Sequence, residues 1–90
     1  MAIIITYDIP SKHKEFKEKM ISRGYKDSIP GPTNCKIIYF PNTTLYHSNK
    51  TADTARDEAL LIAKELGIKL ERCISTIWSN WAAVCGEPFK

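Results

Sequence analysis

Apolar residues dominate the first strand-like segment of the chain. Residues 2–8 read Ala-Ile-Ile-Ile-Thr-Tyr-Asp, and β-branched and aromatic residues of this kind are typical of a buried strand. Pro10 ends the strand because it has no N–H to donate, and it disfavours helical backbone at Ile9. The pattern therefore predicts a central strand that ends in the carboxylate of Asp8.

The next segment has the spacing of an amphipathic helix. Ser11 is a good N-cap, the helix runs to Arg23, and Gly24 is the expected C′ residue. Phe16 and Met20 fall on one face while lysines fill the other. We expect the apolar face to pack on the sheet.

A hairpin and a loop are predicted in the middle of the chain. The expected strands are Tyr25–Ile29 and Cys35–Phe40, because the turn-rich segment 30–34 between them cannot continue either strand. Residues 43–50 are expected to form a loop.

A second helix and a last strand complete the expected order. Thr51 caps the helix, Gly67 ends it, and its apolar stripe consists of Ala55, Ala59, Ile62, Ala63 and Leu66. The last strand spans Ile68 to about Trp78, followed by a tail, Asn80–Lys90. The order β-α-β-β-α-β predicts one α+β domain over residues 1–90 of ferredoxin-like type, with two helices on one face of a four-stranded antiparallel sheet.

The face opposite the helices is expected to be apolar and covered. Ile4, Tyr39 and Ile77 illustrate how both sides of the long strands carry large apolar residues, and an exposed patch of this kind marks an interface. A second copy of the chain, the C-terminal tail with Trp81 and Phe89, or the bases of single-stranded nucleic acid would each cover it. We favour the homodimer through the sheet face.

Composition narrows the class of protein only slightly. With 43% apolar and 26% charged residues the chain resembles an ordinary soluble domain, and no apolar run approaches the ~18 residues of a membrane span. The expectations are no membrane partner and a cytoplasmic location. Cys35, Cys73 and Cys85 form no C-x-x-C pair, so apolar thiols are expected rather than disulfides or zinc ligands.

Positive charge is concentrated in the first helix. Residues 11–26 hold six basic and two acidic residues. They form either a surface for the phosphates of RNA or DNA or simply a solvated helix face. The phosphate-binding candidates on this helix are Lys12, Lys14, Lys17 and Lys19. Arg72 interrupts the last strand, where it would pair with a carboxylate or reach a phosphate.

Asp8 and His47 are the candidate catalytic residues. In a face-to-face dimer two Asp8 carboxylates would share Mg²⁺ or Mn²⁺, which would activate water against a phosphodiester. Alternatively, Asp8 only fixes the turn before the helix. His47, beside Lys50, would act as a general base towards a ribose hydroxyl, or it is merely exposed.

The opening residues Tyr7-Asp8-Ile9-Pro10, followed by a basic helix, resemble the small CRISPR-adaptation nuclease family. The GhoS-type antitoxin endoribonucleases are similar. The resemblance implies a homodimeric ferredoxin-like fold, metal-dependent cleavage of RNA or DNA with Asp8 as the metal ligand, or an architectural role on nucleic acid.

Two classes of function lead at this point, ahead of a small-molecule-binding regulatory domain. The first is a dimeric protein that acts on nucleic acid in a defence or toxin-antitoxin system, as an endoribonuclease or as an inert relative of one. The second is a non-enzymatic module that binds a protein partner, such as an antitoxin or a phage-encoded inhibitor.

Overall fold

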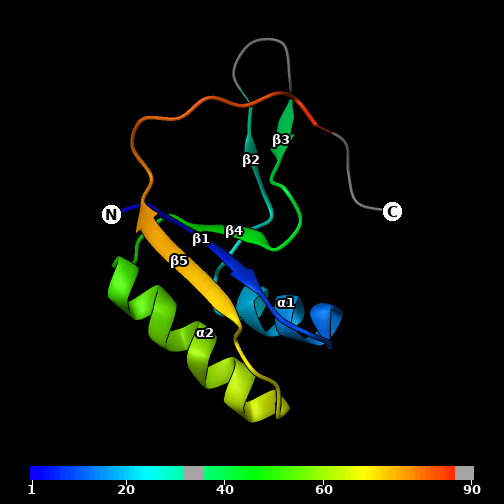
Figure 1. Ribbon diagram of the computed structural model, residues 1–90. Coiled ribbons are helices and arrows are strands. Elements are labelled where there is room, and N and C mark those ends of the chain that lie inside the picture. The colour runs from blue at the N-terminus through cyan, green and yellow to red at the C-terminus, as the bar shows by residue number, and fades with distance from the viewer. Residues whose placement is uncertain (32–35, 87–90) are drawn as a thin grey trace.

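The structure is a computed structural model that describes residues 1–31 and 36–86. Figure 1 shows seven elements in chain order. They are β1 (Ile3–Asp8), α1 (His13–Ser22), β2 (Ser28–Pro30), β3 (Ile37–Tyr39), β4 (Thr44–His47), α2 (Ala52–Leu66) and β5 (Arg72–Ile77). The predicted α+β class, with two helices and antiparallel strands, is confirmed.

The strands form two sheets instead of the predicted single four-stranded sheet. Strand β1 lies between β4 and β5 and is antiparallel to both, while β2 and β3 form a separate antiparallel hairpin. One isolated bridge, Lys26 to Tyr46, joins the chain before β2 to β4. Beyond that bridge the hairpin bends away from the three-stranded sheet (Figure 1).

The predicted loop over residues 43–50 is wrong, because it contains β4. Leu45 is buried and pairs with Ile5, and Tyr46 pairs with Ile4. Pro41 and a positive φ at Thr43 separate β3 from β4, so the chain bends between them. The neighbours of β1 are therefore β4 and β5, and the apolar segment at residues 37–40 lies in the hairpin.

Alternation along β1 defines the two faces of the sheet. Ile3, Ile5 and Tyr7 are buried against the helices, whereas Thr6 and Asp8 on the opposite face are exposed. The buried core contains the predicted helix residues Phe16, Met20, Ala55, Ala59, Ile62 and Ala63. The predicted helical faces are thus confirmed.

The ends of the helices agree with prediction except at the start of α1. Thr51 Oγ1 accepts a hydrogen bond from the N–H of Thr54 at 3.1 Å, and Gly67 follows α2 with φ 69°. Ser11 is not the N-cap of α1. Lys12 holds that position in a left-handed conformation, without a side-chain cap, so the helix begins at His13.

The hairpin and the C-terminal tail lie beyond one end of the three-stranded sheet (Figure 1) and adjoin its second face at Ile4 and Thr44. Trp78 N–H donates to the carbonyl of Ala2, and the tail then passes beside β3. Away from this region the second face is mixed, since Thr6 and Thr76 lie on it with Ile74. The expected apolar face is therefore confined to the area next to the hairpin and the tail.

The cysteines differ from the prediction. Cys73 is a free thiol, as expected, and burial raises its pKa. Cys85 is disulfide-bonded, which the three-cysteine pattern did not predict. Cys35 and Phe89 lie outside the described residues.

Neither of the two helices is long and apolar enough to cross a membrane, as judged over residues 1–31 and 36–86.

Candidate functional site

Asp8 and Arg72 form an ion pair on the second face of the sheet. They are direct partners in the β1–β5 register, and Arg72 Nε donates to Asp8 Oδ2 at 2.6 Å. Their side chains are 51% and 76% exposed. The hydrogen bond and charge of Asp8 raise the pKa of Arg72. Of the two roles predicted for Arg72, the structure shows the pairing with a carboxylate.

A shallow hollow of about 180 Å³ adjoins this pair and is lined by Thr6, Asp8, Arg72 and Ile74, among others. Within the described part of the chain, no group of three or more His, Cys, Asp or Glu residues is placed to hold a metal ion. A divalent cation at Asp8 would thus need ligands from beyond these described residues, such as water, a second copy or a substrate phosphate.

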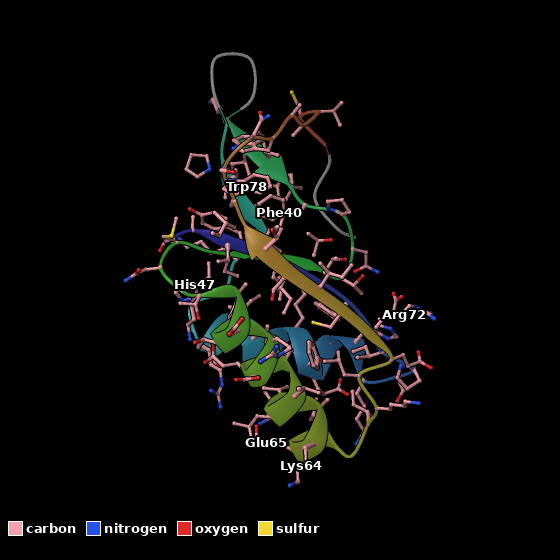
Figure 2. All side chains as sticks on the ribbon, turned by 60° about the vertical axis from the view of Figure 1, so that its left-hand side comes forward. Phe40, His47, Lys64, Glu65, Arg72 and Trp78 are labelled. Carbon is pink, nitrogen blue, oxygen red and sulfur yellow. The ribbon has the colours of Figure 1, made fainter. Side chains whose placement is uncertain are left out.

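His47 lies at the opposite end of the sheet from Asp8. It pairs with Ile3, at the start of β1, while Asp8 ends the same strand, so their backbones are roughly 16 Å apart at about 3.3 Å per residue. Figure 2 shows His47 and Arg72 at the two ends. The two candidate catalytic residues therefore do not share one site within a chain.

The side chain of His47 is held by contacts within the fold. Its Nδ1 accepts a hydrogen bond from the N–H of Asn49 at 3.0 Å, and its ring meets that of Tyr25 edge-on at 5.0 Å. On the other side, its Nε2 faces Gly24 closely enough that a β-carbon there would lie 2.9 Å away. The ring is therefore held between Tyr25 and the end of α1.

A charged cluster around Glu58 was missed in the sequence. Its carboxylate, 14% exposed, accepts hydrogen bonds from Tyr25 Oη at 2.8 Å, from Arg23 at 3.1 Å and from Lys50. Position 58 falls on the buried stripe of α2, between Ala55 and Ile62. A carboxylate on an apolar stripe is the signal that would have found it.

The cluster joins three parts of the chain, and the side chains of Arg23, Tyr25 and Lys50 all donate to Glu58. Burial raises the pKa of Glu58, but the hydrogen bonds from Lys50, Tyr25 and Arg23 outweigh burial, so the net shift is downward. Burial and the hydrogen bond to Glu58 raise the pKa of Tyr25. Lys50 is thus committed to Glu58, rather than free to steady a phosphate beside His47.

Part of the basic helix is also engaged within the chain. Lys12 Nζ donates to the carbonyl of Leu66 at 2.9 Å, and Lys17 pairs with Asp27 at 2.9 Å. Lys14 and Lys19 are exposed. These contacts leave fewer cations available for phosphates than the sequence count indicates.

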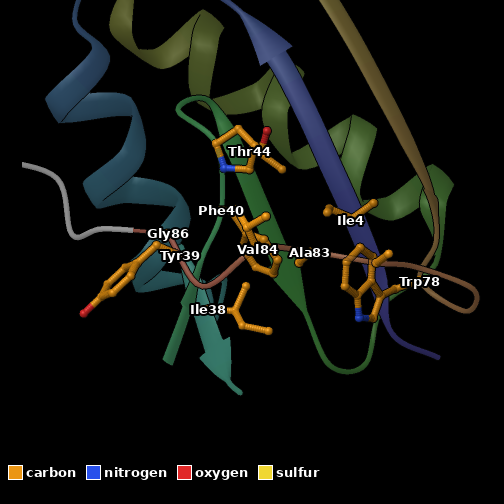
Figure 3. A pocket seen from close by; sticks show the side chains of 11 residues that line it. Ile4, Ile38, Tyr39, Phe40, Thr44, Trp78, Ala83, Val84 and Gly86 are labelled. Atoms are coloured by element: carbon orange, nitrogen blue, oxygen red, sulfur yellow. The ribbon is translucent and has the colours of Figure 1, made fainter. Parts of the chain in front are cut away.

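A second hollow, of about 520 Å³, lies where the hairpin and the tail meet the sheet (Figure 3). None of the described residues that line it is charged. The apolar side chains that shape it are Ile4, Ile38, Phe40, Trp78, Ala83 and Val84. Sequence reasoning predicted the apolar face but not this hollow, because the bend between β3 and β4 creates it.

Aromatic rings pack together at this hollow. Trp78 meets Phe40 edge-on at 5.7 Å, meets Tyr46 edge-on at 6.3 Å, and stacks on Trp81 at 4.7 Å. Such ring pairs add to the energy of apolar burial and hold their partners in defined orientations. The hollow is therefore a shaped apolar surface, in contrast to the hollow at Asp8, whose lining includes a charged pair.

Comparison of the chain with protein-family models, with curated proteins and with solved structures finds no match.

Proposed function

We propose that the chain is a non-enzymatic binding module that takes up an apolar group of a protein partner in the hollow lined by Ile4, Phe40 and Trp78. The observation that carries the proposal is a hollow of about 520 Å³ with aromatic walls and, among the described residues that line it, no charged side chain. Binding pockets are commonly of this size and are mostly apolar.

The rim of the hollow offers further apolar contact area. Val84 is 82% exposed and lines the hollow, while Trp81 stacks on Trp78 beside it. Aromatic residues in well-packed pockets supply much of the binding energy at interfaces. An uncharged lining favours aliphatic or aromatic side chains of the partner over phosphate or carboxylate groups.

The test is selection of peptides from a random display library, with both the oxidised and the reduced chain as bait. We expect selected peptides to share aromatic or branched aliphatic residues. Val84→Asp should weaken their binding about tenfold, a loss of roughly 1.4 kcal/mol. Leu60→Asp is the matched control, since Leu60 is also exposed but lies on α2. Equal binding by both variants, or no selected peptide in either redox state, would refute the proposal.

A second copy of the chain is one protein partner that fits the same surface. The homodimer through the sheet face would bury the rim of the hollow and also Ile74, which lies elsewhere on the second face and is 68% exposed. Light scattering distinguishes a homodimer from a monomer. A dimer that Val84→Asp or Ile74→Asp dissociates would identify the partner as a second copy, and a monomer would leave a different protein.

The second candidate function is action on nucleic acid, and the exposed Asp8–Arg72 pair is the observation that favours it. In this proposal Asp8 holds Mg²⁺ or Mn²⁺ between two copies and Arg72 turns to a phosphate. The bridge between Lys26 and Tyr46 puts the hairpin beside β4, which is consistent with a ferredoxin-like strand order. Labelled RNA and DNA incubated with either metal test it, and cleavage by wild type but not by Asp8→Ala is the supporting result.

A further inference from the structure

Strand β5 is an outer strand of the three-stranded sheet and pairs with β1 on one side (Figure 1). Trp78 N–H donates to the carbonyl of Ala2, and in this register the even-numbered residues of β5 bond to β1. The N–H and C=O groups of Cys73, Ser75 and Ile77 therefore point away from β1. Among the residues that the structure describes, no hydrogen bond reaches these groups.

The sequence of β5 does not protect this open edge. Natural edge strands carry lysine, proline or a bulge, or are covered by another segment, because unpaired backbone groups otherwise pair with another chain. The six residues Arg72–Ile77 include no lysine or proline, and all six are in continuous register with β1, without a bulge. Helix α2 packs on one face of β5, where Ser75 Oγ donates to the carbonyl of Ala52. The outward row of backbone groups is thus available for pairing.

Ile74, in the middle of β5, lacks apolar neighbours on the second face of the sheet. It pairs with Thr6 of β1, which in turn pairs with Thr44 of β4. Along β5, the nearest residues on the same face are Arg72 and Thr76. The Ile74 side chain is accordingly 68% exposed. A strand added at the open edge would supply the apolar neighbour that this row lacks.

We propose that β5 pairs antiparallel with β5 of a second copy, across a two-fold axis at Ile74, so that the two three-stranded sheets join into one. In this register Cys73 exchanges backbone hydrogen bonds with the partner's Ser75, and Ile74 lies directly opposite the partner's Ile74. Apolar pairs across two strands stabilise a sheet. The inference goes beyond the proposed function, because it uses a surface other than the hollow.

The antiparallel direction keeps like charges apart along the strand. Arg72 would lie opposite the partner's Thr76, and Glu71 would lie opposite the partner's Ile77. A parallel pair in register would instead put two copies of Arg72 side by side, which is destabilising. The antiparallel pair also closes on itself, since both copies use the same edge and the dimer leaves no unpaired β5.

Opposite charges would meet on the helix side of the same axis. Ala52 lies beside Ser75, where its carbonyl accepts the hydroxyl hydrogen bond. Burial raises the pKa of Cys73, and the charge of nearby Arg56 opposes that rise, so Arg56 lies towards Cys73. Because Ser75 would pair with the partner's Cys73, the first turn of α2, which contains the exposed Asp53, would face the partner's Arg56. This complementarity favours a second copy as the occupant of the edge.

Light scattering and sedimentation velocity over a range of concentrations test the pairing. We expect wild type to be a dimer and Ile74→Lys to raise its dissociation constant by about tenfold or more, because two lysines would meet at the axis. Ile21→Lys is the matched control, since Ile21 is 44% exposed but lies on α1. Circular dichroism checks that both variants are folded. A wild type that is monomeric at every concentration, or a dimer that Ile74→Lys leaves intact, would overturn the inference.

Cysteine cross-linking tests the register. Directly opposed residues of a non-hydrogen-bonded antiparallel pair have Cα atoms about 4.5 Å apart, which is within the range of a disulfide. Ile74→Cys should therefore form a covalent dimer on mild oxidation, and mass spectrometry should find the bond at position 74. Thr76→Cys is the control, since it would lie opposite Arg72 and not opposite its own copy. Cross-linking of Thr76→Cys in place of Ile74→Cys would refute an axis at Ile74.

Failure of the inference is distinguishable from failure of the proposed function. Val84 lies on the rim of the hollow, away from β5, so Val84→Asp should lose peptide binding but remain a dimer. A dimer that Val84→Asp dissociates would refute pairing through β5 and assign the hollow to the second copy. A dimer that withstands Val84→Asp but selects no peptide would support pairing through β5 and refute the proposed function.

Discussion

Arg72 donates a hydrogen bond to Asp8 across the β1–β5 pair, at the end of the strand that the sequence marks as the candidate catalytic position. Both side chains are largely exposed, so water solvates each of them when the pair is broken. Exposed ion pairs of this kind add little to stability and are weakened by salt. The pair therefore contributes little to folding.

Asp8→Ala should unfold at the same temperature as wild type, within error, in both low and high salt. The reason is the exposure of both partners, since no buried charge is left without a partner. Thermal unfolding, followed by circular dichroism, measures the melting temperature, and Arg72→Ala is the matched variant. A large drop in the melting temperature for either variant would show that the pair is structural, and a cleavage assay on Asp8→Ala would then lose its meaning.

Gly24→Ala should destabilise the chain more than Gly67→Ala. Both glycines follow a helix with positive φ, 94° and 69°, so both substitutions strain the backbone. Only at Gly24 would the β-carbon also meet the ring of His47, at 2.9 Å, whereas nothing lies within 4 Å at Gly67. We expect losses of about 1 kcal/mol at Gly67 and about 2 kcal/mol at Gly24 by urea unfolding.

Equal losses for the two glycine variants would contradict the close packing of His47 on Gly24. The double variant Gly24→Ala with His47→Ala separates the two causes. Removing the ring should recover the part of the loss that comes from contact, and leave the part that comes from the backbone.

Glu58→Gln should reduce stability at pH 7 by about 2 kcal/mol, because the charged carboxylate accepts hydrogen bonds from Arg23, Tyr25 and Lys50. The pKa of Glu58 is lowered on folding, so the folded chain binds fewer protons there than the unfolded chain. The stabilisation is complete above the ordinary value of 4.5 and is lost as the pH falls through the lower folded value.

Urea unfolding at several pH values measures this effect. The difference between wild type and Glu58→Gln should shrink as the solution is acidified below about pH 4.5. Glu65→Gln is the control, since Glu65 is exposed near the end of the same helix (Figure 2). A difference that stays constant with pH would mean that the charge of Glu58 is not what stabilises the cluster.

The sequence predicted the elements whose signals are local. The isoleucines of β1, the apolar faces of both helices, the Thr51 cap and the Gly67 stop all lie where expected. In each case the residues that specify the element belong to the element itself. The propensities of these residues and the period of their apolar positions are sufficient to predict such elements.

The features that the sequence did not predict depend on contacts between distant segments. Strand β4 is four residues long and is followed by Ser48 and Asn49, so its pattern resembles a loop until β1 lies beside it. The Glu58 cluster draws on Arg23, 35 positions away, and no local pattern predicts such a pairing. The tail was only one of three predicted covers for the second face.

Leu45→Ala tests strand β4, which was not predicted from the sequence. Leu45 is buried in β4 against the core of helices and sheet, so its truncation leaves a cavity. We expect a loss of about 3 kcal/mol in the free energy of unfolding. Leu60→Ala, at a half-exposed position on α2, should lose less than about 1 kcal/mol. If urea unfolding gives similar losses for both variants, residues 44–47 do not pack as the third strand of the central sheet, and the hollow beside them is not formed as described.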